Sequence, residues 1–123
     1  MTTITGTIIF EGGPPESIPD GSLLIVKFQD TNLADAPAIT LGEYVQTINN
    51  YQSGEELGFF ITADRRPPHG MRGSLRAVLN IGWTPSGNEW LRKGDWLNDT
   101  RHSVNLSSSN EYYCDVTIKK YNR

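Results

Sequence analysis

Apolar residues recur at every second position in several short segments of this 123-residue chain, with a turn signal between one segment and the next. In residues 4–10, for example, Ile4, Ile8 and Phe10 share one side, while Thr5 and Thr7 share the other. A period of two is the pattern of a β-strand that buries one face. No segment shows a convincing 3.6-residue period, so the alternation predicts an all-β fold.

Seven segments carry this strand pattern, and the spacing between them is typical of a β-sandwich. They are residues 4–10, 22–29, 40–48, 57–61, 74–83, 89–96 and 112–121. The sixth is the least regular, because Lys93-Gly94-Asp95 interrupts it. Twelve glycines and seven prolines supply the turns. We therefore expect a single-domain antiparallel β-sandwich of about seven strands over residues 1–123.

The alternation also divides the apolar residues between an inner and an outer face. The residues expected in the core include Ile4, Ile8, Phe10, Leu24, Val26, Phe28, Leu57, Phe59, Ile61, Leu75, Ala77, Leu79, Ile81, Trp83, Tyr112, Cys114, Val116 and Ile118. Four apolar side chains fall on the opposite face: Leu23, Ile25, Phe60 and Val78. If their strands are neighbours, these four form an outer patch that binds a protein or peptide partner, or a second copy in a homodimer.

A second candidate surface lies in the tryptophan-rich region between the fifth and sixth segments. All three tryptophans, Trp83, Trp90 and Trp96, lie within fourteen residues. Trp83 continues an apolar face and is the expected core member. The alternative ligand-binding set is Trp90, Trp96, Asn88, Arg92 and Asp95, in which aromatic rings stack on a carbohydrate and polar neighbours bind its hydroxyl groups.

The stretch Gln29–Ala38 is expected to be a structured crossover between two strands. Asp30, Asn32 and Asp35 can accept hydrogen bonds from nearby backbone amides, and Pro37 fixes its own backbone angle. Their spacing does not fit a calcium-binding loop with its terminal bidentate glutamate. We therefore interpret these polar residues as turn-forming residues.

Catalytic and metal-binding patterns are not found in the sequence. Cys114 lies on an apolar strand face and is expected to be an inert buried thiol. His69 and His102 have no ligand partner at metal-site spacing and are interpreted as surface residues. No nucleophile elbow, phosphate loop or paired-carboxylate motif is present. We expect a non-enzymatic protein without metal or cofactor.

Charge and hydropathy restrict the partner and the compartment. The net charge of −3 and the scattered Lys and Arg residues disfavour nucleic acid. No apolar run is long enough for a membrane span, and no signal peptide is recognisable. The expected location is cytoplasmic if the chain is complete, and periplasmic or secreted if a leader was removed. Glycosylation sequons begin at Asn98 and Asn105.

Several motifs together resemble the YbaY-like lipoprotein family, which is related to the YscW pilotin of type III secretion. The most distinctive is Leu33-Ala34-Asp35-Ala36-Pro37, and it follows a strand that ends Gln29-Asp30. Further similar motifs are Thr5-Gly6-Thr7, Leu57-x-Phe59-x-Ile61, Leu75-Arg76-Ala77 and Asp115-Val116-Thr117-Ile118.

The resemblance implies a small β-sandwich without catalysis. Where a role is known, as in YscW, it is to bind and chaperone a secretin subunit at the outer membrane. The chain departs from the family in lacking an N-terminal lipobox cysteine and in its longer, tryptophan-rich segment between Trp83 and Trp96. The residues and the resemblance together predict a chaperone-like module for a protein or peptide, with carbohydrate or surface binding as the alternative.

Overall fold

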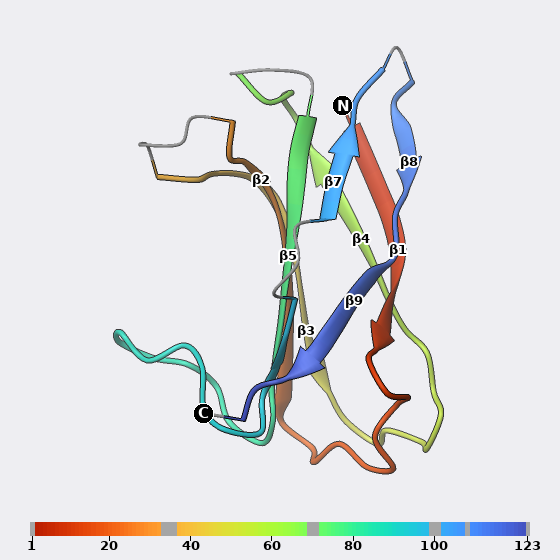
Figure 1. Ribbon diagram of the computed structural model, residues 1–123, viewed down its shortest axis with the longest axis vertical. Helices are drawn as coiled ribbons and strands as arrows, with labels where there is room; N and C mark the ends of the chain where they lie inside the picture. The colour runs from red at the N-terminus through yellow and green to blue at the C-terminus, as the bar shows by residue number, and fades with distance from the viewer. Residues whose placement is uncertain (1, 33–36, 69–71, 99–101, 108, 123) are drawn as a thin grey trace.

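The computed structural model describes residues 2–32, 37–68, 72–98, 102–107 and 109–122, and this part of the chain contains strands but no helix (Figure 1). The strands are β1 (Thr2–Phe10), β2 (Ser22–Asp30), β3 (Ile39–Ile48), β4 (Leu57–Ala63), β5 (Arg72–Asn80), β6 (Trp96–Leu97), β7 (His102–Asn105), β8 (Glu111–Tyr113) and β9 (Val116–Lys120). The all-β prediction is confirmed.

The strands follow one hydrogen-bonded path, in the order β3-β2-β5-β6-β9-β1-β4, with β7 also paired to β5 and β8 also paired to β1. The two end strands, β3 and β4, lie against each other without pairing, so the sheet nearly closes into a barrel. The expected sandwich of two sheets is therefore corrected to a single, barrel-like sheet. The sheet is also mixed, because β1 is parallel to both β8 and β9.

The interior is filled by the alternating residues that the sequence marked as the core. Ile4, Leu24, Val26, Phe28 and Ile61 are fully buried. The other inward residues of β1, β4, β5 and β9 are buried as well: Ile8, Phe10, Leu57, Phe59, Leu75, Ala77, Leu79, Val116 and Ile118. Tyr112 and Cys114 are only half-buried at the margin of this core. Burial of an apolar side chain contributes about 1.5–3 kcal/mol, so this inner face supplies most of the stability.

The segment 81–95 departs from the expected strands over residues 74–83 and 89–96. β5 ends at Asn80, so Ile81 and Trp83 lie outside the strand and are only half-buried. Residues 89–95 form a loop, and β6 is reduced to Trp96 and Leu97. Glycines at positive φ, including Gly82 at 75° and Gly94 at 96°, bend this backbone away from a ladder.

A short strand that the alternation did not identify, β7, continues the pairing of β5 beyond β6. Between the two, the buried Asn98 side chain takes the place of a strand: its Oδ1 accepts the Ala77 N–H at 2.8 Å, and its Nδ2 donates to the Leu75 carbonyl at 2.9 Å. Asn98 also begins one of the two glycosylation sequons, and a glycan on its Nδ2 would break this bridge. The asparagine of the other sequon, Asn105, is exposed.

The last expected strand is divided into β8 and β9 at Cys114 and Asp115. Here the Asp115 carboxylate accepts the Thr7 N–H at 2.9 Å, a bond that a strand carbonyl would otherwise accept. Gly6 makes this approach possible, because a Cβ there would collide with the Cys114 carbonyl. The parallel contact between the two ends of the chain therefore depends on a glycine and a carboxylate.

The crossover after β2 begins as expected. The Asp30 carboxylate accepts hydrogen bonds from the Asn32 backbone N–H at 2.9 Å and from its side-chain amide at 2.8 Å. The Asn32 amide also donates to the Arg72 carbonyl, which joins the crossover to the start of β5. Asp35 lies outside the described residues, and Pro37 is exposed.

We predict that Gly42→Ala destabilises the domain at the contact between β3 and β4. A Cβ at Gly42 would lie 2.7 Å from Ile61 Cγ2 and 3.0 Å from the Thr62 carbonyl oxygen. Overpacking of this kind costs about 1–3 kcal/mol, which a urea melt measures directly. The matched control is Gly58→Ala on β4, where a Cβ meets only the Gly6 carbonyl, at 3.7 Å. Equal midpoints for the two variants would contradict a tight contact at the open ends of the sheet.

Candidate functional site

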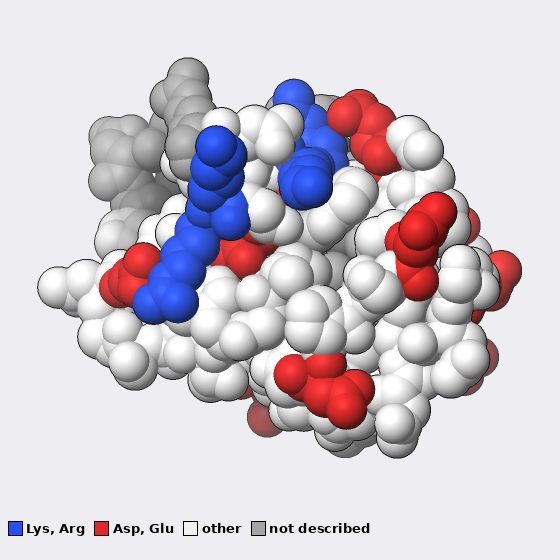
Figure 2. Space-filling view, turned by 90° about the horizontal axis from the view of Figure 1, so that it is seen from below, with Lys and Arg blue, Asp and Glu red and all other residues white. Residues whose placement is uncertain are grey.

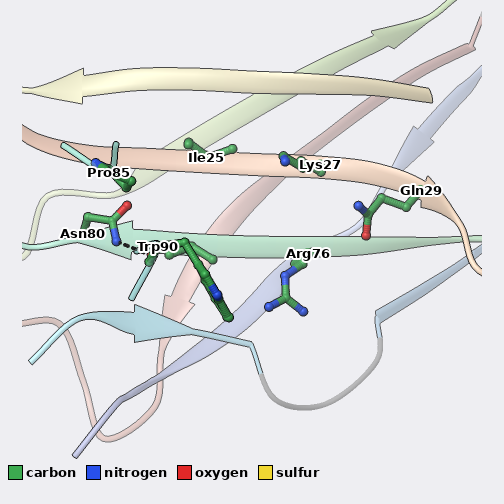
Figure 3. A pocket seen from close by; sticks show the side chains of 8 residues that line it. Ile25, Lys27, Gln29, Arg76, Asn80, Pro85 and Trp90 are labelled. Atoms are coloured by element: carbon green, nitrogen blue, oxygen red, sulfur yellow. Dashed lines mark hydrogen bonds between the residues drawn. The ribbon is translucent and has the colours of Figure 1, made fainter. Parts of the chain in front are cut away.

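A groove of about 410 Å³ lies on the outer face of the sheet, over β2 and β5 and beneath the 81–95 loop (Figure 3). The loop contributes Pro85 and Trp90 to its wall. The strands contribute the floor residues Ile25, Lys27, Gln29, Arg76, Val78 and Asn80. The groove therefore combines an apolar part with a polar part, as ligand sites commonly do.

The strand register places the floor residues in successive cross-strand pairs, and each pair forms one level of the floor. Ile25 on β2 is paired with Val78 on β5, and Lys27 is paired with Arg76. Within each pair, outward side chains of neighbouring strands lie side by side. The apolar pair is half-buried, whereas Arg76 is exposed. The apolar level therefore lies next to a level that carries two positive charges.

The loop that forms the wall is held by one buried carboxylate, Asp95, which is 1% exposed. Its Oδ1 accepts the Ile81 N–H at 2.8 Å, and its Oδ2 accepts the Arg92 N–H at 2.8 Å. The indole N–H of Trp83 lies 3.1 Å from both oxygens. Because hydrogen bonds to charged groups are stronger than neutral ones, Asp95 fixes both ends of the loop to the end of β5.

Asn80, at the end of β5, connects this carboxylate to the groove. Its Nδ2 donates to Asp95 Oδ2 and to the Trp90 carbonyl, both at 3.0 Å. Trp90 is 47% exposed, and the guanidinium carbon of Arg76 lies 4.8 Å from its ring centre. The stacked Arg76 and the Asn80 bond together hold Trp90 beside the floor, as Figure 3 shows.

The outer apolar set predicted from the sequence is separated by the structure. Ile25 and Val78 line the groove together. Leu23 is half-buried, one alternation before Ile25 on β2, and does not line the groove. Phe60 lies on β4, 60% exposed, with its ring centre 5.7 Å from that of Tyr44. Of the expected four-residue patch, Ile25 and Val78 therefore lie in the groove, whereas Leu23 and Phe60 lie outside it.

The alternative carbohydrate set is also divided. Trp96 is 9% exposed and packs edge-to-face on Phe10 at 5.0 Å, so it is a core residue and not a stacking platform. Trp83 is half-buried outside the strand, with the Arg92 guanidinium 3.9 Å from its ring centre. Trp83 is therefore not the core member that the alternation predicts, because β5 ends at Asn80.

The polar members of that set, which belong to the loop, do not line the groove. Asp95 is buried, and its oxygens accept the bonds described above. Arg92 forms a bidentate ion pair with Glu89, at 2.8 and 3.0 Å, on the exposed side of the loop. This contact lowers the pKa of the Glu89 carboxyl and raises the pKa of the Arg92 guanidinium. Asn88 is exposed but does not line the groove. Only Trp90 of the set belongs to it.

Five groove residues were missed in the sequence: Lys27, Gln29, Arg76, Asn80 and Pro85. Lys27, Gln29 and Arg76 could have been found, because all three alternate with the core residues of strands that we expected to be long. Asn80 and Pro85 could not, because their place depends on how the loop folds over β5.

Neither Cys114 nor His102 lines the groove. Cys114 is half-buried, and burial, followed by the negative charge of Asp115, raises the pKa of its thiol. His102 is half-buried, and its Nε2 accepts the Thr117 N–H at 3.1 Å. His69 lies outside the described residues. Within the part of the chain that the structure describes, no group of His, Cys, Asp and Glu could hold a metal ion.

The lower end of the molecule carries both signs of charge. In Figure 2, basic side chains gather at the upper left and upper middle of this face, and acidic side chains lie beside them and over the remainder. Among the described residues, no helix is long and apolar enough to cross a membrane.

Taken together, these features define a small all-β protein with a barrel-like sheet and an open groove on its outer face. No family model matches the chain, and no curated protein matches it. A solved structure, that of an alternative pilotin from the type II secretion system of Vibrio cholerae, is similar along 99% of this chain and 98% of its own. The TM-score is 0.67 and the sequence identity is 21%, so the two proteins share a fold.

We predict that Asp95→Asn destabilises the loop and the groove with it. An amide keeps the size of the side chain but places an NH₂ group against N–H donors, and an unsatisfied buried donor costs about 1–3 kcal/mol. Urea melts and limited proteolysis within residues 81–95 measure the effect.

The matched control is Asp115→Asn, whose exposed side chain accepts one backbone N–H and keeps an oxygen for it. Equal losses of stability in the two variants would contradict the central role of Asp95.

Proposed function

We propose that this protein is a non-enzymatic binding module that holds a short segment of another protein in the groove over β2 and β5. The observation that carries the proposal is the groove itself: an apolar level formed by Ile25 and Val78, covered on one side by Pro85 and Trp90. A tryptophan beside a concave apolar surface is the typical anchor of a protein interface.

The groove is large enough for a short peptide segment but not for a whole domain. A volume of about 410 Å³ accommodates a few side chains. Its wall is held by buried bonds from Asp95 and Asn80, so the site is formed before the partner arrives. A preformed site lowers the entropic cost of binding, which favours a short ligand.

We further propose that the role is pilotin-like, that is, to escort a component of a secretion system. The fold of the Vibrio cholerae pilotin supports this, as does the resemblance of the sequence motifs to the YbaY-like family and YscW. Both are analogies of fold and motif, which suggest a class of partner without identifying it. A carbohydrate is a weaker candidate, because Trp96 and Asp95 are buried.

The test is selection of a phage-displayed library of random peptides on the native protein, followed by calorimetric titration of the selected peptides. A C-terminal segment of a secretin from the same genome is included as a probe of the pilotin-like role. We expect selected peptides to bind the wild type and to bind Trp90→Ala at least about tenfold more weakly, as expected for a central aromatic anchor.

The matched control is Phe60→Ala, which removes an exposed aromatic side chain on another part of the outer face. It should leave the affinity unchanged. Failure to select any peptide, or equal losses in the two variants, would overturn the proposed function. Light scattering on the same samples shows whether the groove is instead occupied by a second copy of the chain.

A further inference from the structure

We propose that the groove selects a segment with a defined order of groups: a hydrogen-bond donor, an apolar side chain, and then an acidic side chain. This inference rests on the proposed function and specifies the partner of the same site. Three features carry it: an acceptor without a partner at one end of the groove, the apolar pair in the middle, and two positive charges toward the other end.

The order follows from the strand register. Along β5, Asn80, Val78 and Arg76 succeed one another at every second residue, and all three line the groove. At about 3.3 Å per residue, the step from Asn80 to Arg76 is about 13 Å. Ile25 and Lys27 on β2 repeat the apolar and cationic levels beside them. An extended peptide of about four residues spans the same distance.

The acceptor at the first end is Asn80 Oδ1, which is buried and has no hydrogen-bond partner. Its orientation is fixed, because Nδ2 donates to two acceptors, Asp95 Oδ2 and the Trp90 carbonyl. A flipped amide would place its oxygen against both of them. An unsatisfied buried acceptor is costly, so an N–H group from a ligand is favourable at this position.

The charges at the other end come from Lys27 and Arg76. The guanidinium of Arg76 stacks on Trp90, and among the described residues neither cation forms an ion pair. Glu43 is the register partner of Lys27 on β3, but the two do not form an ion pair either. Two neighbouring cations beside an apolar level favour a carboxylate, which accepts charge-assisted hydrogen bonds.

A peptide fits this arrangement better than a fatty acid does. A fatty acid supplies the carboxylate and the apolar chain, but its far end carries no donor for Asn80 Oδ1. A peptide supplies a backbone N–H at the required end and a glutamate or aspartate side chain at the other. The positions on the floor repeat every second residue, which matches the alternation of an extended segment.

The test uses the peptides selected from the random phage library on the full protein. We expect enrichment of an Asp or Glu at a fixed position, following an apolar residue. For a synthetic peptide of this kind, replacing Glu by Gln should weaken binding at least about tenfold, and raising the salt concentration should weaken binding of the Glu peptide more.

Two variants and one modified peptide separate the contributions. Lys27→Glu should bind the Glu peptide at least about tenfold more weakly and should prefer the same peptide with Lys in that position. The matched control, Lys120→Glu on β9, should behave like the wild type. N-methylation of the amide nearest Asn80 should also weaken binding, because it removes the donor.

The outcomes distinguish this inference from the proposed function. Peptides that bind through Trp90 but show no acidic preference, or tolerate N-methylation, would overturn the inference and leave the proposed function standing. Sodium laurate that competes with the peptides for the groove, and binds more tightly than they do, would overturn the inference in favour of a fatty acid. If no peptide binds at all, both are overturned.

Discussion

The candidate site depends on the hydrogen bonds that converge on the buried Asp95 carboxylate. They join Ile81 at the start of the 81–95 loop to Arg92 near its end, and they hold Asn80 at the end of β5. Without an acceptor there, the donors would be buried without partners. The loop would then lose the hydrogen bonds that hold it over the sheet. The wall of the groove, and so the groove, follows from this one charged residue.

The barrel-like sheet supplies the other half of the site. Its outer face is free to carry function because the inner face, from Ile4 to Ile118, supplies the burial that stability requires. Long, hydrogen-bonded β2 and β5 lie side by side in the sheet and give the groove a rigid floor. A rigid floor and a fixed wall make a preformed site, which is better suited to selective binding than a mobile surface is.

Much of the fold could be predicted from the sequence, because a period of two reports which face of each strand is buried. The alternation correctly placed Leu24, Val26 and Phe28 inside and Ile25 and Val78 outside. It could not show that the sheet is barrel-like, because closure depends on which strands become neighbours and not on the pattern within any one strand. The glycines at the close approaches, Gly6 and Gly42, read as ordinary strand residues.

The site was only partly predictable for a similar reason. Where a side chain belongs to a long strand, its face was predicted correctly. In the loop and just after it, the prediction was wrong for two tryptophans: Trp96, on β6, is buried, and Trp83 is only half-buried. The loop is organised by the contacts of Asp95 with Ile81 and Trp83, which lie more than ten positions away. Alternation contains no information about such contacts.

The most direct test of the central claim, that the groove over β2 and β5 is the binding site, is a map of amide and indole NMR shifts during titration with a selected peptide. If the groove is the binding site, the largest changes occur at the backbone amides of Ile25, Lys27 and Val78 and at the indole N–H of Trp90. Signals from Phe60 and Tyr113, which are exposed elsewhere on the outer face, should stay in place. Shifts that cluster at Phe60 or Tyr113, with the groove signals unchanged, would contradict it.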